Sequence, residues 1–364
     1  MRGLLSSLPM TIRLPGRLFL LSGCLSLLAP LCAAAAPQPP ARVQRVDSPR
    51  APRPRGSTRA IGLTRAARDP HPSAYTRGLA GKGLALKLAK QPSTKLGRFV
   101  SALGKVAGAN INAPRPTTPE GTYGAVANGT AFVDGVKLDD VRQGHLADCF
   151  FVASLASVAY THPELIQHAI AEQKDGTMAI TLFHKTGSGS FERDAVTIDK
   201  LVPLSGAGPQ FARGQVSTQM WPAWMQKAYT AQVSTLDGVA PSYGTINNGG
   251  TPGDAFEALT GKPSRTMSVS PAMSASLYSA IDTAVKANRP MAAVTPKTLP
   301  EGAPVHGWHT YSVLGVRTDN GKQLVKVRNP WGYSEPGDPN GGDGIFEIDI
   351  ATFAKSFSSL AIGG

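Results

Sequence analysis

QGHLADCFFVASLASVA, which runs from Gln143 to Ala159, is the most informative stretch of this sequence. Its residues from Leu146 onward are apolar on most faces, which predicts a buried helix that ends before Pro163. Asp148 is a good N-cap residue, so we expect Cys149 in the first turn of that helix. There the positive end of the helix dipole would favour the thiolate, the nucleophilic form of cysteine. Because a cysteine in an apolar helix is more often a core residue, a catalytic role also requires a base.

The best-placed base among the seven histidines is His309. It begins the apolar stretch HTYSVLGV, which predicts a strand, and a ring at the start of a strand can project into a cleft. His306, in the preceding loop, is the alternative base. Asn329 ends another expected strand in VRNPWG, where its amide could orient the imidazole and Trp331 could cover that bond from water.

These stretches resemble the motifs of the calpain family of cysteine peptidases. QGHLADCFFVASLASVA is similar to the nucleophile motif of that family, GWHTYSV (307–313) to its histidine strand, and KVRNPWG (326–332) to its asparagine motif. WPAWMQKAY, SYGTINNGGTPGDAFEALTG and DGIFEIDIATFAKSF resemble, in that order, its bracing helix, its glycine-bearing cleft loop and its closing strand and helix. The resemblance covers about residues 120–364, and three such motifs in the same order are highly specific.

The resemblance implies a role for each residue of the catalytic set. Cys149 would attack the scissile carbonyl and His309 would take its proton, the pair resting as thiolate and imidazolium. Asn329 would orient the ring, and Trp331 would shield that contact. Gln143 would offer its side-chain amide, alongside the backbone N–H of Cys149, to the developing oxyanion.

The resemblance also implies contacts with an extended protein or peptide substrate. Gly249, Gly250 and the carbonyl of Trp308 would pair with the substrate backbone, since glycine lets two main chains approach closely. Ala147 and Phe150 stand where the family usually has glycine and tryptophan. These changes could alter the wall of the cleft, but they remove no reacting group.

No cofactor is expected, and calcium dependence is not carried over from the family. We expect a version without the regulatory calcium modules, and the acidic residues that bind calcium in the core do not map clearly onto this sequence. YSEPGDPNGGDG replaces the tryptophan-rich loop of the family after Trp331. Glu335, Asp338 and Asp343 could ligate an ion, but a polar turn is the favoured interpretation.

The N-terminal part is predicted to direct export. Residues 1–36 combine a basic start, an apolar run (18–32) and four alanines, which is typical of a cleavable signal peptide and of a secreted or periplasmic protein. A lipoprotein anchored at Cys24 and an uncleaved membrane anchor are the competing interpretations. Once the signal is removed, Cys149 is the single cysteine, which excludes an internal disulfide.

Residues 37–115 are predicted to be a disordered linker or pro-segment rich in Pro, Arg and Gly. Residues 37–100 carry 14 Lys and Arg against two acids, so contact with an acidic polymer is an alternative role. Nothing in the sequence indicates specific nucleic-acid binding or an oligomeric state.

From residue 116 the pattern is that of an α+β protein with two lobes, in the manner of papain. Residues 116–262 would form a helical lobe with the nucleophile, and residues 263–364 an antiparallel β lobe with the histidine and asparagine. The predicted reaction is hydrolysis of internal peptide bonds through an acyl-enzyme thioester. The alternatives are acyl transfer of the transglutaminase type, against which Asn329 argues because that chemistry usually has an acid in third place, and a binding module with an inactive protease fold.

Overall fold

The computed structural model describes residues 110–112, 115–118, 120–333, 335 and 342–364, all within Ala67–Gly364. The predictions for the signal peptide, for Cys24 and for most of residues 37–115 lie outside the described residues, as does Asp338. Export and the role of the basic segment therefore stay predictions.

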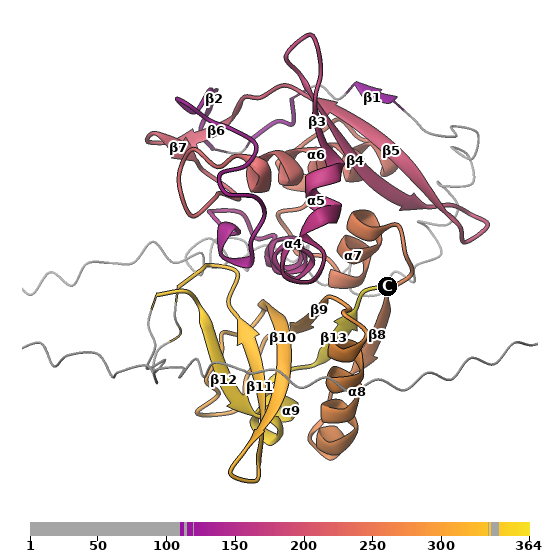
Figure 1. Ribbon diagram of the computed structural model, residues 1–364, viewed down its shortest axis with the longest axis vertical. Helices are drawn as coiled ribbons and strands as arrows, with labels where there is room; N and C mark the ends of the chain where they lie inside the picture. Colours follow the sequence, from indigo (N-terminus) through magenta and orange to yellow (C-terminus); the bar gives the residue numbers. More distant parts are fainter. Residues whose placement is uncertain (1–109, 113–114, 119, 334, 336–341) are drawn as a thin grey trace, which may run out of the picture. The chain divides into compact units, whose positions relative to one another are not determined.

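The described residues form helices and mostly antiparallel sheets, so the α+β prediction is confirmed (Figure 1). The helices are α4 (Cys149–Thr161), α5 (Pro163–Ala169), α6 (Trp221–Leu236), α7 (Pro252–Thr260), α8 (Ser274–Lys286) and α9 (Ile350–Ser356), with short 3-10 turns at Leu138–Asp140, Tyr243–Thr245 and Pro271–Met273. The strands are β1 (Asn110–Asn112), β2 (Thr122–Gly124), β3 (Ile170–Glu172), β4 (Met178–Lys185), β5 (Phe191–Ile198), β6 (Val202–Ser205), β7 (Gly208–Pro209), β8 (Arg265–Ser268), β9 (Met291–Val294), β10 (Thr310–Asp319), β11 (Lys322–Arg328), β12 (Ile345–Asp349) and β13 (Ser359–Ile362).

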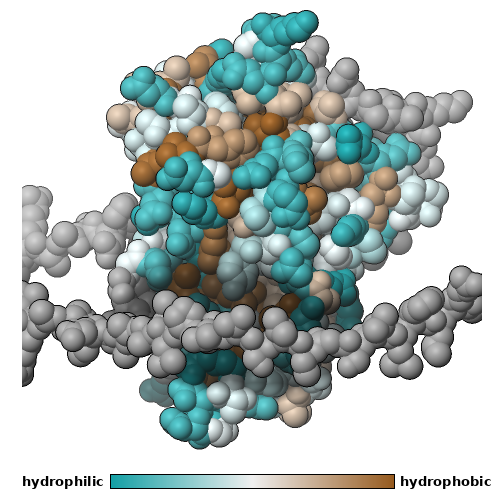
Figure 2. All heavy atoms as spheres, viewed as in Figure 1, coloured by the Kyte–Doolittle hydropathy of each residue, from teal (hydrophilic) through white to brown (hydrophobic). Residues whose placement is uncertain are grey.

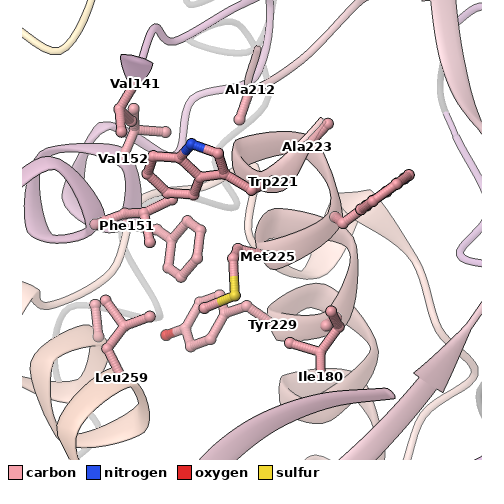
Figure 3. Packing of buried hydrophobic residues seen from close by; sticks show 14 of the residues in the cluster. Val141, Phe151, Val152, Ile180, Ala212, Trp221, Ala223, Met225, Tyr229 and Leu259 are labelled. Carbon is pink, nitrogen blue, oxygen red and sulfur yellow. The ribbon is translucent and has the colours of Figure 1, made fainter. Parts of the chain in front are cut away.

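Helix α4 is a core helix, which is why its sequence is apolar on most faces. Every residue from Phe150 to Ala159 is buried. Phe151 stacks on Tyr229 of α6 with ring centroids 4.3 Å apart, and Figure 3 shows Met225 beside this pair. The helix begins at Cys149, directly after Asp148 as the N-cap prediction has it, and it ends at Thr161, just before α5 starts at Pro163.

A six-stranded sheet carries a hydrophobic cluster of its own. Its strand order is β12-β11-β10-β9-β13-β8, and every neighbouring pair is antiparallel. Helices α8 and α9 pack on it through buried residues such as Leu277, Ile281 and Phe353. The strand that follows the histidine, β10, lies in the interior of this sheet, where it is fixed by partners on both sides.

Two serine side chains connect α4 to this sheet. The hydroxyl of Ser157 donates to the carbonyl of Met291 at 2.9 Å and accepts from the N–H of Met291 at 2.8 Å. The hydroxyl of Ser312, on β10, donates to the carbonyl of Ala153 at 2.7 Å. The helix that begins at the cysteine and the strand that follows the histidine are therefore held in contact.

The region predicted as a helical lobe also contains strands of two sheets, with strand orders β1-β5-β4-β3 and β2-β6-β7. Strand β1 (Asn110–Asn112) lies before this region, within residues 37–115, and pairs with β5. Strands β4 and β5 are eight residues each, and they pair along their whole length, from Met178 with Ile198 to Lys185 with Phe191. Pairing of this kind is not visible in the sequence of either strand alone.

Among the described residues, no single helix has the length and apolar composition needed to cross a membrane, although α4 and α5 meet the criterion as a pair bent by 109°. Hydrophilic residues cover much of the face shown in Figure 2, and hydrophobic residues reach it in patches.

Candidate active site

Cys149 is the first residue of α4 and is partly exposed. Its Sγ donates a hydrogen bond to Oγ1 of Thr310 at 3.7 Å. Thr310 directly follows His309 and begins β10. The structure thus brings the predicted nucleophile against Thr310, the residue next to the predicted base, although the two residues are 161 positions apart in the sequence.

Burial raises the pKa of the Cys149 thiol to about 11. The hydrogen bond with Thr310 acts in the opposite direction, and the negative charge of Asp148 raises the pKa further. The expected preference of this position for the thiolate therefore stays a prediction, since burial acts on the thiol in the opposite direction. A thiolate at this position needs a positive partner to form at neutral pH.

The side chain of Asp148 does not cap α4, contrary to expectation. It is fully buried, where Oδ2 accepts from Nε2 of Gln226 at 2.5 Å and Oδ1 lies 3.5 Å from Nε2 of Gln143. Burial raises its pKa from 3.8 to about 7, and the two amide donors only partly offset this effect. The carboxyl group therefore contributes a buried acid directly beside the nucleophile.

Gln143 is buried in the loop that precedes α4. Its backbone N–H donates to the carbonyl of Pro330 at 2.8 Å, which connects the nucleophile loop to the NPWG turn. Its Nε2 donates to the carbonyl of Leu146 at 2.7 Å. Oε1 of the same amide is buried without a hydrogen-bond partner among the described residues. The amide is engaged within its own loop here, so its role toward an oxyanion stays a prediction.

His309 and Asn329 lie against each other in the structure. Nε2 of His309 lies 2.9 Å from Oδ1 of Asn329, and Asn329 is fully buried. The backbone N–H of Trp331 donates to the same oxygen at 3.0 Å, and the indole ring lies 4.5 Å from the imidazole, between centroids. The backbone N–H of His309 donates to Oγ1 of Thr295 at 2.9 Å, which fixes the start of the strand.

The glycine-bearing loop is attached to the nucleophile loop. The N–H of Gly249, whose φ is +79°, donates to the carbonyl of Ala147 at 3.2 Å. The N–H of Ala147 donates to Oδ1 of Asn247 at 2.8 Å. A Cβ at Gly250 would lie 2.6 Å from the ring of Phe150, so glycine is required here by a neighbouring side chain.

Trp308 is 64% exposed, although it directly precedes His309. Its φ of +54° is in the left-handed region, which is unusual for a bulky residue. Nζ of Lys297 lies 5.1 Å from the centroid of the indole ring. This exposed position beside the histidine is compatible with the predicted contact between its carbonyl and a substrate.

Sequence reasoning missed three residues of this site. Thr310 and Asn247 contact the nucleophile and its loop, as described above. Glu335 was interpreted as part of a polar turn or an ion site, but its carboxylate is buried against Asn329 and Tyr311. The polar NNGG sequence around Asn247 was a usable signal, whereas the inward direction of Glu335 depends on its contacts with Tyr311 and Asn329.

The described residues contain no group of three or more His, Cys, Asp or Glu side chains arranged to hold a metal ion. Oδ1 of Asp343 accepts from the backbone N–H of Ile345 at 2.8 Å, as in a polar turn. A thiol, an imidazole and an amide in this order can perform nucleophilic acyl chemistry without a cofactor.

Comparison with known proteins covers the part of the chain that contains these three motifs. Residues 121–338 match the family described as calpain family cysteine protease. The calpain-1 catalytic subunit of Mus musculus is 30% identical over 230 residues, which is 58% of this chain and 30% of that protein. A thiol protease of Porphyromonas gingivalis is 28% identical over 225 residues, which is 57% of this chain and 46% of that protein. The match therefore covers less than half the length of either relative. The structure of digestive procathepsin L 3 of Tenebrio molitor larval midgut is 12% identical, with a TM-score of 0.27, and the alignment covers 74% of this chain and 79% of that one.

Proposed function

This chain belongs to the calpain family of cysteine proteases, and we propose that it hydrolyses internal peptide bonds with Cys149 as nucleophile, His309 as base and Asn329 as orienting group. The observation that supports this proposal most directly is the 2.9 Å contact between Nε2 of His309 and Oδ1 of Asn329. Because Nε2 faces the amide, Nδ1 is the ring nitrogen that we assign to the thiol.

The proposed reaction has two halves. In the first, the thiol proton of Cys149 moves to His309, and the sulfur attacks the scissile carbonyl carbon. The tetrahedral intermediate then collapses to a thioester as the imidazolium of His309 gives its proton to the leaving amine. In the second half, His309 takes a proton from water, the hydroxide attacks the thioester, and the carboxylate product leaves as the thiol is restored.

Electrostatics in the site support a paired proton transfer. Burial and the charge of Asp148 disfavour a lone thiolate at Cys149, so the anion depends on an imidazolium beside it. Asn329 accepts from the ring through Oδ1 and so favours its protonated form. Trp331 covers this contact, which reduces the competition from water.

The backbone N–H of Cys149 is in the first turn of α4, where helical N–H groups have no partner within the helix. We assign it to the oxyanion, together with the amide of Gln143.

An extended protein substrate would pair with Gly249, Gly250 and the carbonyl of Trp308. We also propose export by residues 1–36, a linker or pro-segment at 37–115, and lobes at 116–262 and 263–364.

The experiment that tests this function compares the full chain with Cys149→Ala on casein. We expect fragments from the wild type and none from the variant at equal concentration and equal thermal stability. Equal cleavage by both proteins, or none by either, would refute the proposal. Incubation of the same preparations with a glutamine donor and a labelled primary amine tests the alternative of acyl transfer, for which we expect no product.

A further inference from the structure

The carboxylate of Glu335 lies directly behind the asparagine of the site. It is 5% exposed, and its Oε1 accepts from Nδ2 of Asn329 at 2.6 Å. The hydroxyl of Tyr311 donates to the same oxygen at 2.6 Å. The other oxygen, Oε2, lies 2.5 Å from Nε2 of His306. Oε1 thus accepts two hydrogen bonds, and Oε2 faces the ring of His306, with which it forms an ion pair when that ring is protonated.

We propose that Glu335 is a positioning residue that selects the working orientation of the Asn329 amide, an inference that rests on the proposed peptidase function. An asparagine amide can turn by about 180°, which exchanges its oxygen and its nitrogen. Only the oxygen can accept a hydrogen bond from the imidazole of His309. An ionised carboxylate can only accept, so Glu335 requires the nitrogen of the amide on its own side.

Trp331 makes the same selection from the other side. Its backbone N–H donates to Oδ1 of Asn329 at 3.0 Å, so the oxygen faces two donors, one of which is His309. In the reversed orientation the amide nitrogen would face both donors and its oxygen would face the carboxylate. Each of these contacts would be repulsive in a site where Asn329 is fully buried.

Tyr311 and His306 hold Glu335 in place. Burial, together with the charge of Glu335, raises the pKa of Tyr311, so its hydroxyl stays protonated and can donate. The same hydroxyl accepts from the backbone N–H of His306 at 2.8 Å. The ring of His306 lies 4.6 Å from the ring of Trp331, between centroids. His306, the alternative base of the sequence analysis, is therefore assigned to the support of Glu335.

A negative charge behind the amide also strengthens its function. The carboxylate polarises the N–H bonds of Asn329 and so makes Oδ1 a better acceptor for the imidazolium. The imidazolium is in turn required for the thiolate, because burial raises the pKa of the thiol. Glu335 thereby acts on the nucleophile through two intervening residues, without contact with the substrate.

The test compares Glu335→Ala and Glu335→Gln with the wild-type full chain on a fluorogenic peptide. We expect Glu335→Ala to lower kcat by about 10- to 100-fold, as for a misplaced catalytic group, with KM changed by less than about twofold. The kcat of Glu335→Gln should lie between that of Glu335→Ala and that of the wild type, because the carbonyl oxygen of the glutamine can still accept from Asn329 and Tyr311. The matched control is Glu347→Gln, which removes an exposed carboxylate paired with Arg317 and should leave kcat unchanged.

An unchanged kcat in Glu335→Ala at unchanged thermal stability would overturn the proposal. A kcat of Glu335→Gln as low as that of Glu335→Ala would also overturn it. If Glu335→Ala does not fold, Tyr311→Phe removes one support of the carboxylate and should lower kcat about threefold or more. If the wild type cleaves nothing, the peptidase function fails. The rate of alkylation of Cys149 at pH 6 then still tests the positioning, since Glu335→Ala should react more slowly than the wild type, and equal rates would reject it.

Discussion

Nε2 of Gln226, on α6, donates a 2.5 Å hydrogen bond to Oδ2 of Asp148, although the two residues lie 78 positions apart. Oε1 of the same amide accepts from the backbone N–H of Ala212 at 3.0 Å, which fixes the direction of the amide. The carboxyl group next to the nucleophile is thus held in the core by neutral donors. Its charge acts on the thiol of Cys149, and its own ionisation is displaced toward neutral pH.

Asp148→Asn is expected to make Cys149 more reactive toward alkylating agents. The charge of Asp148 raises the pKa of the thiol, and the pKa of Asp148 itself is about 7, so the effect should appear above about pH 7, where the carboxyl is ionised. We expect iodoacetamide to label the variant roughly two- to tenfold faster at pH 8.5, which corresponds to less than about one pKa unit. Asp282→Asn, on the exposed face of α8, is the control and should match the wild type. Slower labelling of Asp148→Asn would contradict the assigned direction.

The same carboxyl group should make the stability of the fold depend on pH. Its pKa is raised from 3.8 to about 7, so between these values the native state binds a proton that the unfolded chain has released. Unfolding then releases that proton. The free energy of unfolding should therefore fall as pH rises from about 4 to about 7, by up to about 4 kcal/mol from this group, and should be insensitive to it above that range.

Urea unfolding at pH 4.5 and at pH 8 measures this dependence. In Asp148→Asn the carboxyl is absent, so the variant should lose less stability than the wild type between the two values. Asp282→Asn again serves as the control, because it removes an exposed carboxyl group from α8. An identical loss of stability in Asp148→Asn and in the wild type would show that Asp148 does not titrate in this range.

The sequence predicted the parts of the site that are local motifs. Helix α4 could be recognised because burial on all sides requires an apolar residue at nearly every position. His309 and Asn329 could be proposed together because His309 directly precedes one recognisable strand, β10, and Asn329 directly follows another, β11. In each case the residues that carry the signal lie within about one turn or one strand of the functional side chain.

The parts that could not be predicted depend on contacts between distant segments. Asp148 has the composition of an N-cap, but Gln226 and the core around it draw its carboxyl group inward. Glu335 stands in a polar loop, yet Tyr311 and Asn329 hold its carboxylate inside the site. The pKa of Cys149 depends on burial by other elements, and a single helix sequence contains no information on that burial.

His309→Ala is expected to move the reactivity of Cys149 to alkaline pH. Without an imidazolium, the thiol should ionise with the pKa of about 11 that burial gives it. In the wild type, the imidazolium should support a thiolate at pH 6. Labelling at pH 6 should therefore be at least about 100-fold slower in the variant, since each pKa unit is a factor of ten in thiolate.

The control for this measurement is His162→Ala, which removes a surface histidine paired with Glu164. Its labelling profile should follow that of the wild type at every pH. If His309→Ala is labelled at pH 6 as fast as the wild type, the imidazole does not support the thiolate, and the assignment of His309 as base is wrong.

Gly250→Ala is expected to destabilise the fold through the wall of the site. The added Cβ would lie 2.6 to 2.9 Å from ring atoms of Phe150, which is buried on α4 and cannot move freely. Overpacking of this kind costs about 1–3 kcal/mol in the free energy of unfolding. Gly187→Ala is the matched control, because a Cβ there meets no atom within 4 Å and the φ of Gly187 is not positive.

Urea unfolding of Gly250→Ala, of Phe150→Leu and of the double variant separates the clash from other effects. The cost of Gly250→Ala should be smaller in the Phe150→Leu background, and an undiminished cost would mean that the ring is not what requires the glycine.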